Sequence, residues 1–106
     1  MKFNPTRLLL LGFVATLSSP VLAQDSGADI FTKSCVLCHG ADGTGNTPAG
    51  KAFQAASLKD PKVTSQSDAA LHAVVKNGKN KMPAFKDQLT DKQIDSVIAY
   101  VRTLSK

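Results

Sequence analysis

Two thiols and an imidazole lie within five consecutive residues, Cys35-Val36-Leu37-Cys38-His39, of this 106-residue chain. Side chains three residues apart on a helix lie on one face, so both thiols can reach the same edge of a planar ligand. Thiols that add across two vinyl groups form thioethers, and a neighbouring imidazole can bind iron. The spacing is the signature of covalent haem c attachment. We therefore expect one haem c per chain, attached at Cys35 and Cys38, with His39 as an iron ligand.

A methionine is the candidate for the sixth iron ligand. Met82 follows His39 by 43 residues, in the segment Lys81-Met82-Pro83-Ala84-Phe85. The following proline stiffens the backbone, and thioether ligation raises the reduction potential of a haem. His72 is the rival ligand, but Leu71 is predicted to face the core, so His72 is expected to point to solvent.

Other chemistry is open to the cysteines. A thioredoxin-like redox pair requires a βαβ setting, which the sequence lacks. A disulfide across two intervening residues would close a very short loop and stabilise little. A structural zinc site needs four ligands, and Cys35, Cys38, His39 and His72 are the only cysteines and histidines in the chain. A zinc-stabilised binding module therefore remains an alternative.

The first 23 residues have the pattern of a cleaved secretory signal. Lys2 and Arg7 precede a largely apolar run over residues 8–17, and Val21-Leu22-Ala23 suits a signal peptidase. The run is much shorter than the ~20 residues that span a bilayer, so we do not expect a membrane-spanning protein. Cleavage after Ala23 would release the chain into the periplasm or an equivalent lumen.

The remaining residues, 24–106, form one predicted domain of 83 residues. They keep 11 of the 13 basic side chains and all eight acidic ones, a net charge of +3. This charge is too small to indicate nucleic-acid binding. A chain of this size is near the lower limit for burying a sufficient core, so a bulky cofactor is expected to complete it.

Hydrophobic spacing predicts an all-α fold with three main helices. The first helix should begin after Ser26, with Asp29 completing a capping box, and continue to Gly40. The second is expected from Ser67 to Asn77-Gly78. The third should begin after Thr90 and carry its apolar residues at helical spacing as far as Leu104.

The connections between these helices are rich in helix-breaking residues. Residues 40–61 contain four glycines and two prolines, which predicts a long loop with at most a turn of helix over residues 51–56. A loop of this length is unusual in so small a domain. We therefore expect it to wrap around the cofactor.

Taken in order along the chain, these residues resemble the small class I monohaem c-type cytochromes. The resemblance rests on Gly27, Phe31, the Cys35–His39 motif, Met82-Pro83 and Tyr100, and covers nearly all of residues 24–106. It implies a cytochrome c-like fold with its helices and loops wrapped around one haem, in which Gly27 and Phe31 meet Tyr100 where the first and last helices cross. It also implies a soluble electron carrier, not an enzyme, that transfers single electrons through haem c ligated by His39 and Met82.

The sequence departs from the family pattern after the motif. Larger members hold the proximal histidine through the carbonyl of a following proline, whereas Pro48 lies only nine residues after His39. Lys51 and Gln54 are candidate partners for the haem propionates. If Met82 does not ligate iron, the open site would instead bind a gas or peroxide.

Four lysines surround the expected methionine ligand. Lys76, Lys79, Lys81 and Lys86 lie within about ten positions of Met82, with Asp87 as the nearby acid. We expect a monomer whose lysines lie around the haem edge and attract acidic redox partner proteins.

Overall fold

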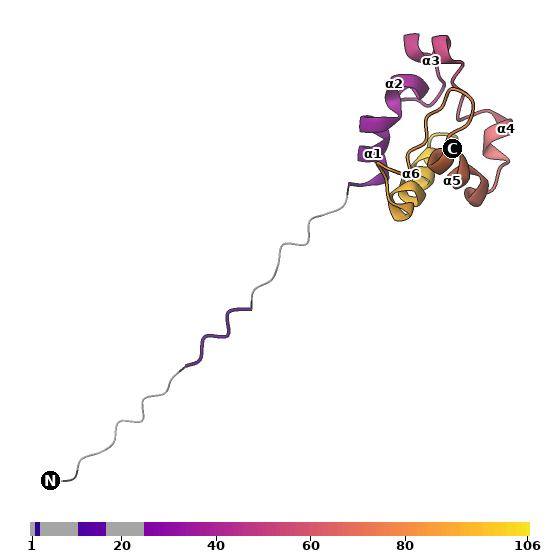
Figure 1. The fold of residues 1–106 in the computed structure, drawn as a ribbon. Coiled ribbons are helices and arrows are strands. Elements are labelled where there is room, and N and C mark those ends of the chain that lie inside the picture. Colours follow the sequence, from indigo (N-terminus) through magenta and orange to yellow (C-terminus); the bar gives the residue numbers. More distant parts are fainter. Residues whose placement is uncertain (1, 3–10, 17–24) are drawn as a thin grey trace.

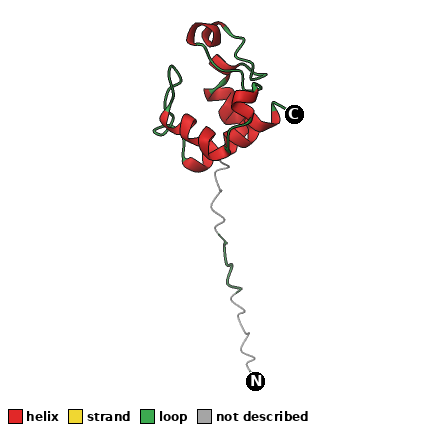
Figure 2. Cartoon of the chain, turned by 90° about the vertical axis from the view of Figure 1, so that its right-hand side faces the viewer, coloured by secondary structure: helices red, strands yellow, loops and turns green. Residues whose placement is uncertain are grey.

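Helices account for all the regular structure of the described chain. The computed structural model describes residues 2, 11–16 and 25–106, and Figure 1 shows the helices packed together at the C-terminal end of the chain. In chain order they are α1 (Gly27–Ser34), α2 (Val36–His39), α3 (Pro48–Phe53), α4 (Pro61–Thr64), α5 (Asp68–Asn77) and α6 (Asp91–Thr103). Figure 2 shows helices and loops without a strand in the described residues, which confirms the all-α prediction.

Most of the predicted signal peptide, residues 1–23, lies outside the described residues. Within it, residues 11–16 form no helix, and the side chains of Leu11, Phe13 and Val14 are exposed. Among the residues that the structure describes, no helix has both the length and the apolar character needed to cross a membrane.

The start of α1 confirms the predicted capping box, but α1 ends sooner than expected. The Ser26 hydroxyl accepts a hydrogen bond from the Asp29 backbone N–H, and the Asp29 carboxylate accepts one from the Ser26 N–H. The prediction of one continuous helix to Gly40 was wrong, because Cys35 interrupts it with a φ of −119°. A new turn, α2, begins there and ends at Gly40, whose φ is +79°. Cys38 therefore still lies one helical turn after Cys35.

Helix α1 crosses α6 at close range, as the resemblance implied. A Cβ at Gly27 would overlap the Ser96 carbonyl of α6, so the glycine allows the two backbones to approach. The rings of Phe31 and Tyr100 meet at 5.3 Å between centroids, tilted by 52°. Phe31 is 1% exposed and forms a buried core with Ile30 and Val97.

Helix α5 packs against the other side of α6. Its predicted limits are confirmed: the Ser67 hydroxyl caps the first turn, and Gly78 ends the helix with a φ of +78°. The predicted capping box of α6 is also present, since Thr90 and Gln93 each accept a hydrogen bond from the other's backbone N–H.

The loop between α2 and α5 contains more helix than expected. Helix α3 begins at Pro48, not at residue 51, because the Thr47 hydroxyl accepts a hydrogen bond from the Gly50 N–H and caps it. Helix α4 was not predicted. Asp60 caps it and Pro61 occupies its first turn, a local signal that the sequence does contain.

Candidate functional site

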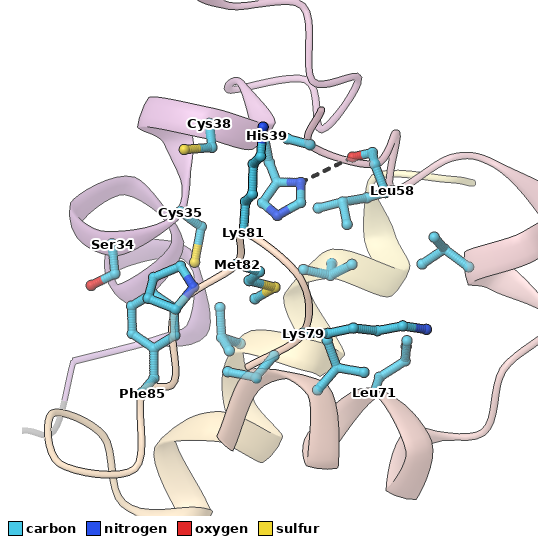
Figure 3. A pocket seen from close by; sticks show the side chains of 18 of the residues that line it. Ser34, Cys35, Cys38, His39, Leu58, Leu71, Lys79, Lys81, Met82 and Phe85 are labelled. Carbon is cyan, nitrogen blue, oxygen red and sulfur yellow. Dashed lines mark hydrogen bonds between the residues drawn. The ribbon is translucent and has the colours of Figure 1, made fainter. Parts of the chain in front are cut away.

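A cavity of about 460 Å³ opens between α1, α2, α5 and α6. Its volume is within the range of pockets that bind organic ligands, about 300–1,000 Å³. Most of its wall is apolar, and its apolar residues include Phe31, Leu58, Val63, Leu71, Val74, Val75, Phe85, Val97, Ile98 and Val101. All four predicted haem residues, Cys35, Cys38, His39 and Met82, also line it, and Figure 3 shows how their side chains lie.

The two thiols lie side by side along one wall of the cavity. Both cysteines are free and partly exposed. Burial, and secondarily the neighbouring Cys38, raise the pKa of the Cys35 thiol from 9.0 to about 11. The reactive thiol of a thioredoxin-like pair has a lowered pKa, so Cys35 does not have the properties of such a thiol.

The imidazole of His39 is oriented by a backbone carbonyl. Its Nδ1 lies 3.0 Å from the Ala56 carbonyl oxygen, so Nδ1–H donates there and the unprotonated Nε2 can act as a ligand. Figure 3 shows this second ring nitrogen facing into the cavity. The role that a proline carbonyl plays in larger relatives therefore belongs here to Ala56, whereas Pro48 occupies the first turn of α3.

The loop that follows fixes the backbone around His39. The Gly45 N–H donates to the His39 carbonyl oxygen at 2.7 Å, and the Thr47 hydroxyl donates to the Leu37 carbonyl oxygen at 2.7 Å. A Cβ at Gly50 would overlap the Cys38 carbonyl, so α3 packs directly against the end of α2. The backbone of the motif is therefore held by hydrogen bonds and by close packing with the loop and α3.

Met82 reaches the cavity from a tight turn. The Met82 N–H donates to the Lys79 carbonyl at 2.9 Å, and the Lys79 N–H donates to the Met82 carbonyl at 3.1 Å. Just beyond the turn, the Phe85 N–H donates to the Val75 carbonyl of α5 at 3.0 Å. In Figure 3 the Met82 thioether extends into the cavity from a different segment than the His39 ring.

His72 lies away from the cavity, on the face of α5 that contacts α6. Its Nδ1 is 2.6 Å from an Asp95 carboxylate oxygen, and its Nε2 is 3.0 Å from one of Asp91. The expectation that His72 points to solvent was wrong, because these two carboxylates hold a side chain that is only 20% exposed. Hydrogen bonds to Asp95 and then Asp91 raise the pKa of His72 above its ordinary value.

The zinc alternative needs His72 beside the Cys35–His39 motif, and the structure does not bring them together. Among the described residues, no group of three or more histidine, cysteine or acidic side chains could hold a metal ion. Of the two candidate propionate partners, Gln54 lines the cavity and Lys51 does not.

An all-α fold around an apolar cavity, with paired thiols beside an oriented imidazole, defines a protein built for a covalently attached haem. The family described as "Cytochrome C oxidase, cbb3-type, subunit III" matches residues 22–101. A cytochrome c6 from Nostoc sp. is 46% identical over 99 residues, covering 89% of this chain and 86% of that protein. A cytochrome c6 from Thermosynechococcus vestitus is 38% identical over 103 residues, covering 94% and 88% respectively.

Solved structures agree with the sequence comparisons. The KustC0563 c-type cytochrome is similar with a TM-score of 0.70 and 26% sequence identity, covering 77% of this chain and 100% of that one. This chain belongs to the class I c-type cytochromes. It carries one covalently bound haem c and is an electron carrier, not an enzyme.

Proposed function

We propose that Cys35 and Cys38 would attach the haem through two thioethers and that His39 and Met82 would supply the ligands to its iron. The observation that carries the proposal is the convergence of these four side chains on one apolar cavity. Bound there, the haem supplies a one-electron couple between ferric and ferrous iron. With His39 and Met82 both serving as iron ligands, electrons would pass through the haem edge without any substrate reaching the metal.

The protein residues set the properties of this centre. Ala56 holds the Nδ1 proton of His39, which fixes the ring orientation and makes Nε2 a better donor to iron. The two backbone hydrogen bonds between Lys79 and Met82 fix the turn that carries the thioether. A thioether ligand and an apolar wall both favour ferrous iron, so we expect a relatively high reduction potential.

The test of ligation is the pair Met82→Leu and Met82→His. Leucine keeps an apolar side chain of similar volume and removes the sulfur, so the ferrous variant should bind carbon monoxide and the ferric one cyanide. Histidine should keep six-coordinate iron and lower the reduction potential, since a second imidazole favours ferric iron. If the reduction potential and the access of carbon monoxide and cyanide are unchanged in both variants, Met82 only packs in the cavity. If the parent protein itself binds carbon monoxide readily, a gas- or peroxide-binding protein is favoured instead.

The test of attachment is the double change Cys35→Ala and Cys38→Ala. Haem should then be extracted by acidic acetone, whereas in the parent it should stay with the denatured polypeptide. Cys35→Ala alone should leave one thioether and serves as the intermediate control. Haem that stays with the denatured double variant would contradict the assignment.

We also propose that residues 1–23 direct export and are removed. The exposed apolar side chains of Leu11, Phe13 and Val14 support this proposal, since they add nothing to the core. The mass of the protein isolated from the periplasm should correspond to a chain that begins at Gln24 and carries one haem. Retention of the full 106 residues would contradict cleavage.

Lysines at the cavity mouth support a proposal for partner docking. Lys79 and Lys81 line the cavity, and both side chains are seen there in Figure 3. Lys76 is partly neutralised, because its Nζ lies 3.0 Å from Asp91. We propose that Lys79 and Lys81, with Lys86 and to a smaller extent Lys76, attract an acidic surface of the redox partner to a monomeric cytochrome.

The docking proposal predicts a salt-dependent reaction. The second-order electron-transfer rate with a physiological partner should fall as salt rises from roughly 10 to 200 mM, since the screening length shrinks from about 30 Å to below 10 Å. Changing Lys79 and Lys81 to Glu should slow the reaction at low salt. The control is Lys92→Glu with Lys106→Glu, which makes the same change in net charge at exposed residues that do not line the cavity. Equal rates in the two double variants would contradict the proposal.

A further inference from the structure

One arginine joins the last helix to a remote segment of the chain. Arg102, in the last turn of α6, donates from Nη1 to the Thr64 carbonyl at 3.0 Å and from Nη2 to the Gln66 carbonyl at 2.5 Å. Its Nε and Nη2 also donate to one carboxylate oxygen of Asp68, at 3.0 and 2.9 Å. The side chain is 27% exposed, whereas that of Asp68 is 78% exposed.

The acceptors of Arg102 lie in a short stretch of the chain that forms part of one wall of the cavity. They lie between the end of α4 and the start of α5, and from this segment Val63 and Gln66 line the cavity. Val101, next to Arg102 in the chain, lines the same cavity from α6. The Arg102 side chain therefore connects α6, on one side of the cavity, to the wall formed by α4 and the residues that lead into α5.

The two carbonyl contacts need the geometry of a guanidinium. Its planar group presents donors in several fixed directions, so Arg102 can bind two backbone carbonyls and a carboxylate at once. A lysine ammonium at the same position would keep the charge but cannot reproduce this set of contacts. The charge of Arg102 is itself compensated by Asp68, so its main influence on the cavity is expected to be geometric.

We propose that Arg102 is a positioning residue for electron transfer: it holds the wall formed by Val63–Gln66 against the haem and thereby limits the access of water to it. This role rests on the proposed occupation of the cavity by haem. Water near the haem stabilises the more highly charged ferric state, so a closed wall raises the reduction potential. A loosened wall should lower the potential without displacing Met82, which is held by a different segment.

The test compares Arg102→Lys with the parent in the haem-bound protein. Hydrogen exchange of the amides of residues 62–66 should accelerate about tenfold, corresponding to the loss of one or two directed hydrogen bonds. The reduction potential should shift downward, while the far-red absorption band of ferric methionine-ligated haem persists. Amide exchange in residues 79–86 should stay at the parent rate.

Two further variants separate this role from a simple loss of charge or stability. Lys33→Gln removes one positive charge from the exposed pair with Asp25 and should change neither the wall exchange nor the potential. Asp68→Asn weakens the Arg102 contact without removing it. The amide exchange of residues 62–66 should therefore accelerate less than in Arg102→Lys, and the reduction potential should fall by a smaller amount. If the Arg102→Lys protein does not accumulate with haem, Asp68→Asn is compared with the parent in its place.

The outcomes distinguish this proposal from the ligand assignment. An unchanged potential in Arg102→Lys, with or without faster wall exchange, would overturn the positioning role. If the parent itself lacks the methionine band, the assignment of Met82 fails, whereas the comparison of wall exchange and potential still tests Arg102.

Discussion

With Met82 as the proposed iron ligand, replacing Gly78 by alanine should weaken the bond between its thioether and iron more than it unfolds the protein. Gly78 has a φ of +78° and a ψ of 167°, a conformation open almost only to glycine. An added Cβ would lie 2.8 Å from the Met82 carbonyl oxygen and 2.9 Å from the Ala84 nitrogen. Both are backbone atoms that cannot rotate away, so the segment carrying Met82 must move.

The size of the effect follows from the strain at this position. Holding alanine in such a conformation costs about 1–3 kcal/mol. If the Met82 segment moves off the iron to relieve that strain, the population without the methionine bond should rise by about 5–150-fold. Strain that stays in the fold should instead lower the thermal midpoint by about 4–8 °C for each kcal/mol.

Two measurements separate these results. Loss of the far-red band and faster cyanide binding by the ferric protein report the methionine bond, and far-ultraviolet circular dichroism reports unfolding. Gly43→Ala is the matched control, because its φ is +79° and its Cβ would first meet the Leu104 Cδ1 at 3.1 Å, a side-chain atom that can rotate away. It should lower the thermal midpoint and keep the far-red band. A Gly78→Ala protein with parental cyanide binding would refute the inference that Gly78 positions Met82.

Two more predictions concern the packing of α6. Gly27→Ala should destabilise the protein by about 1–3 kcal/mol, as measured by denaturant unfolding, because its Cβ would overlap the Ser96 carbonyl; a change within 0.5 kcal/mol of zero would contradict the close crossing. His72 has a folded-state pKa raised above 6.5 by Asp95 and Asp91, so its stabilisation is complete below pH 6.5 and is lost as pH rises through the raised value. As the pH rises from 6.5 through the raised pKa, the thermal midpoint of the parent should fall relative to that of His72→Gln. If the thermal midpoints of the two proteins change in parallel with pH, the contacts of His72 with Asp95 and Asp91 do not stabilise the fold.

Features that depend on residues close together in sequence could be predicted. The capping boxes of Ser26 with Asp29 and of Thr90 with Gln93 are interactions over three residues, and both are present. The same reasoning identified the Cys35–His39 motif, whose spacing alone limits its chemistry, and the structure places it in the cavity with Met82. Even the unpredicted α4 has a local signal in Asp60-Pro61.

The remaining features depend on contacts between distant residues. The carbonyl that orients His39 comes from Ala56, 17 residues away, and a backbone carbonyl carries no residue identity that a sequence pattern can reveal. Arg102 finds its acceptors 34 to 38 residues back in the chain, and His72 finds its carboxylates on another helix. The sequence by itself predicted which side chains attach and ligate the haem, because the motif spacing and the single methionine of residues 24–106 are local features. Only the packing of α5, α6 and the intervening loops decided which backbone groups and charges hold them, because those partners become neighbours only once the chain has folded.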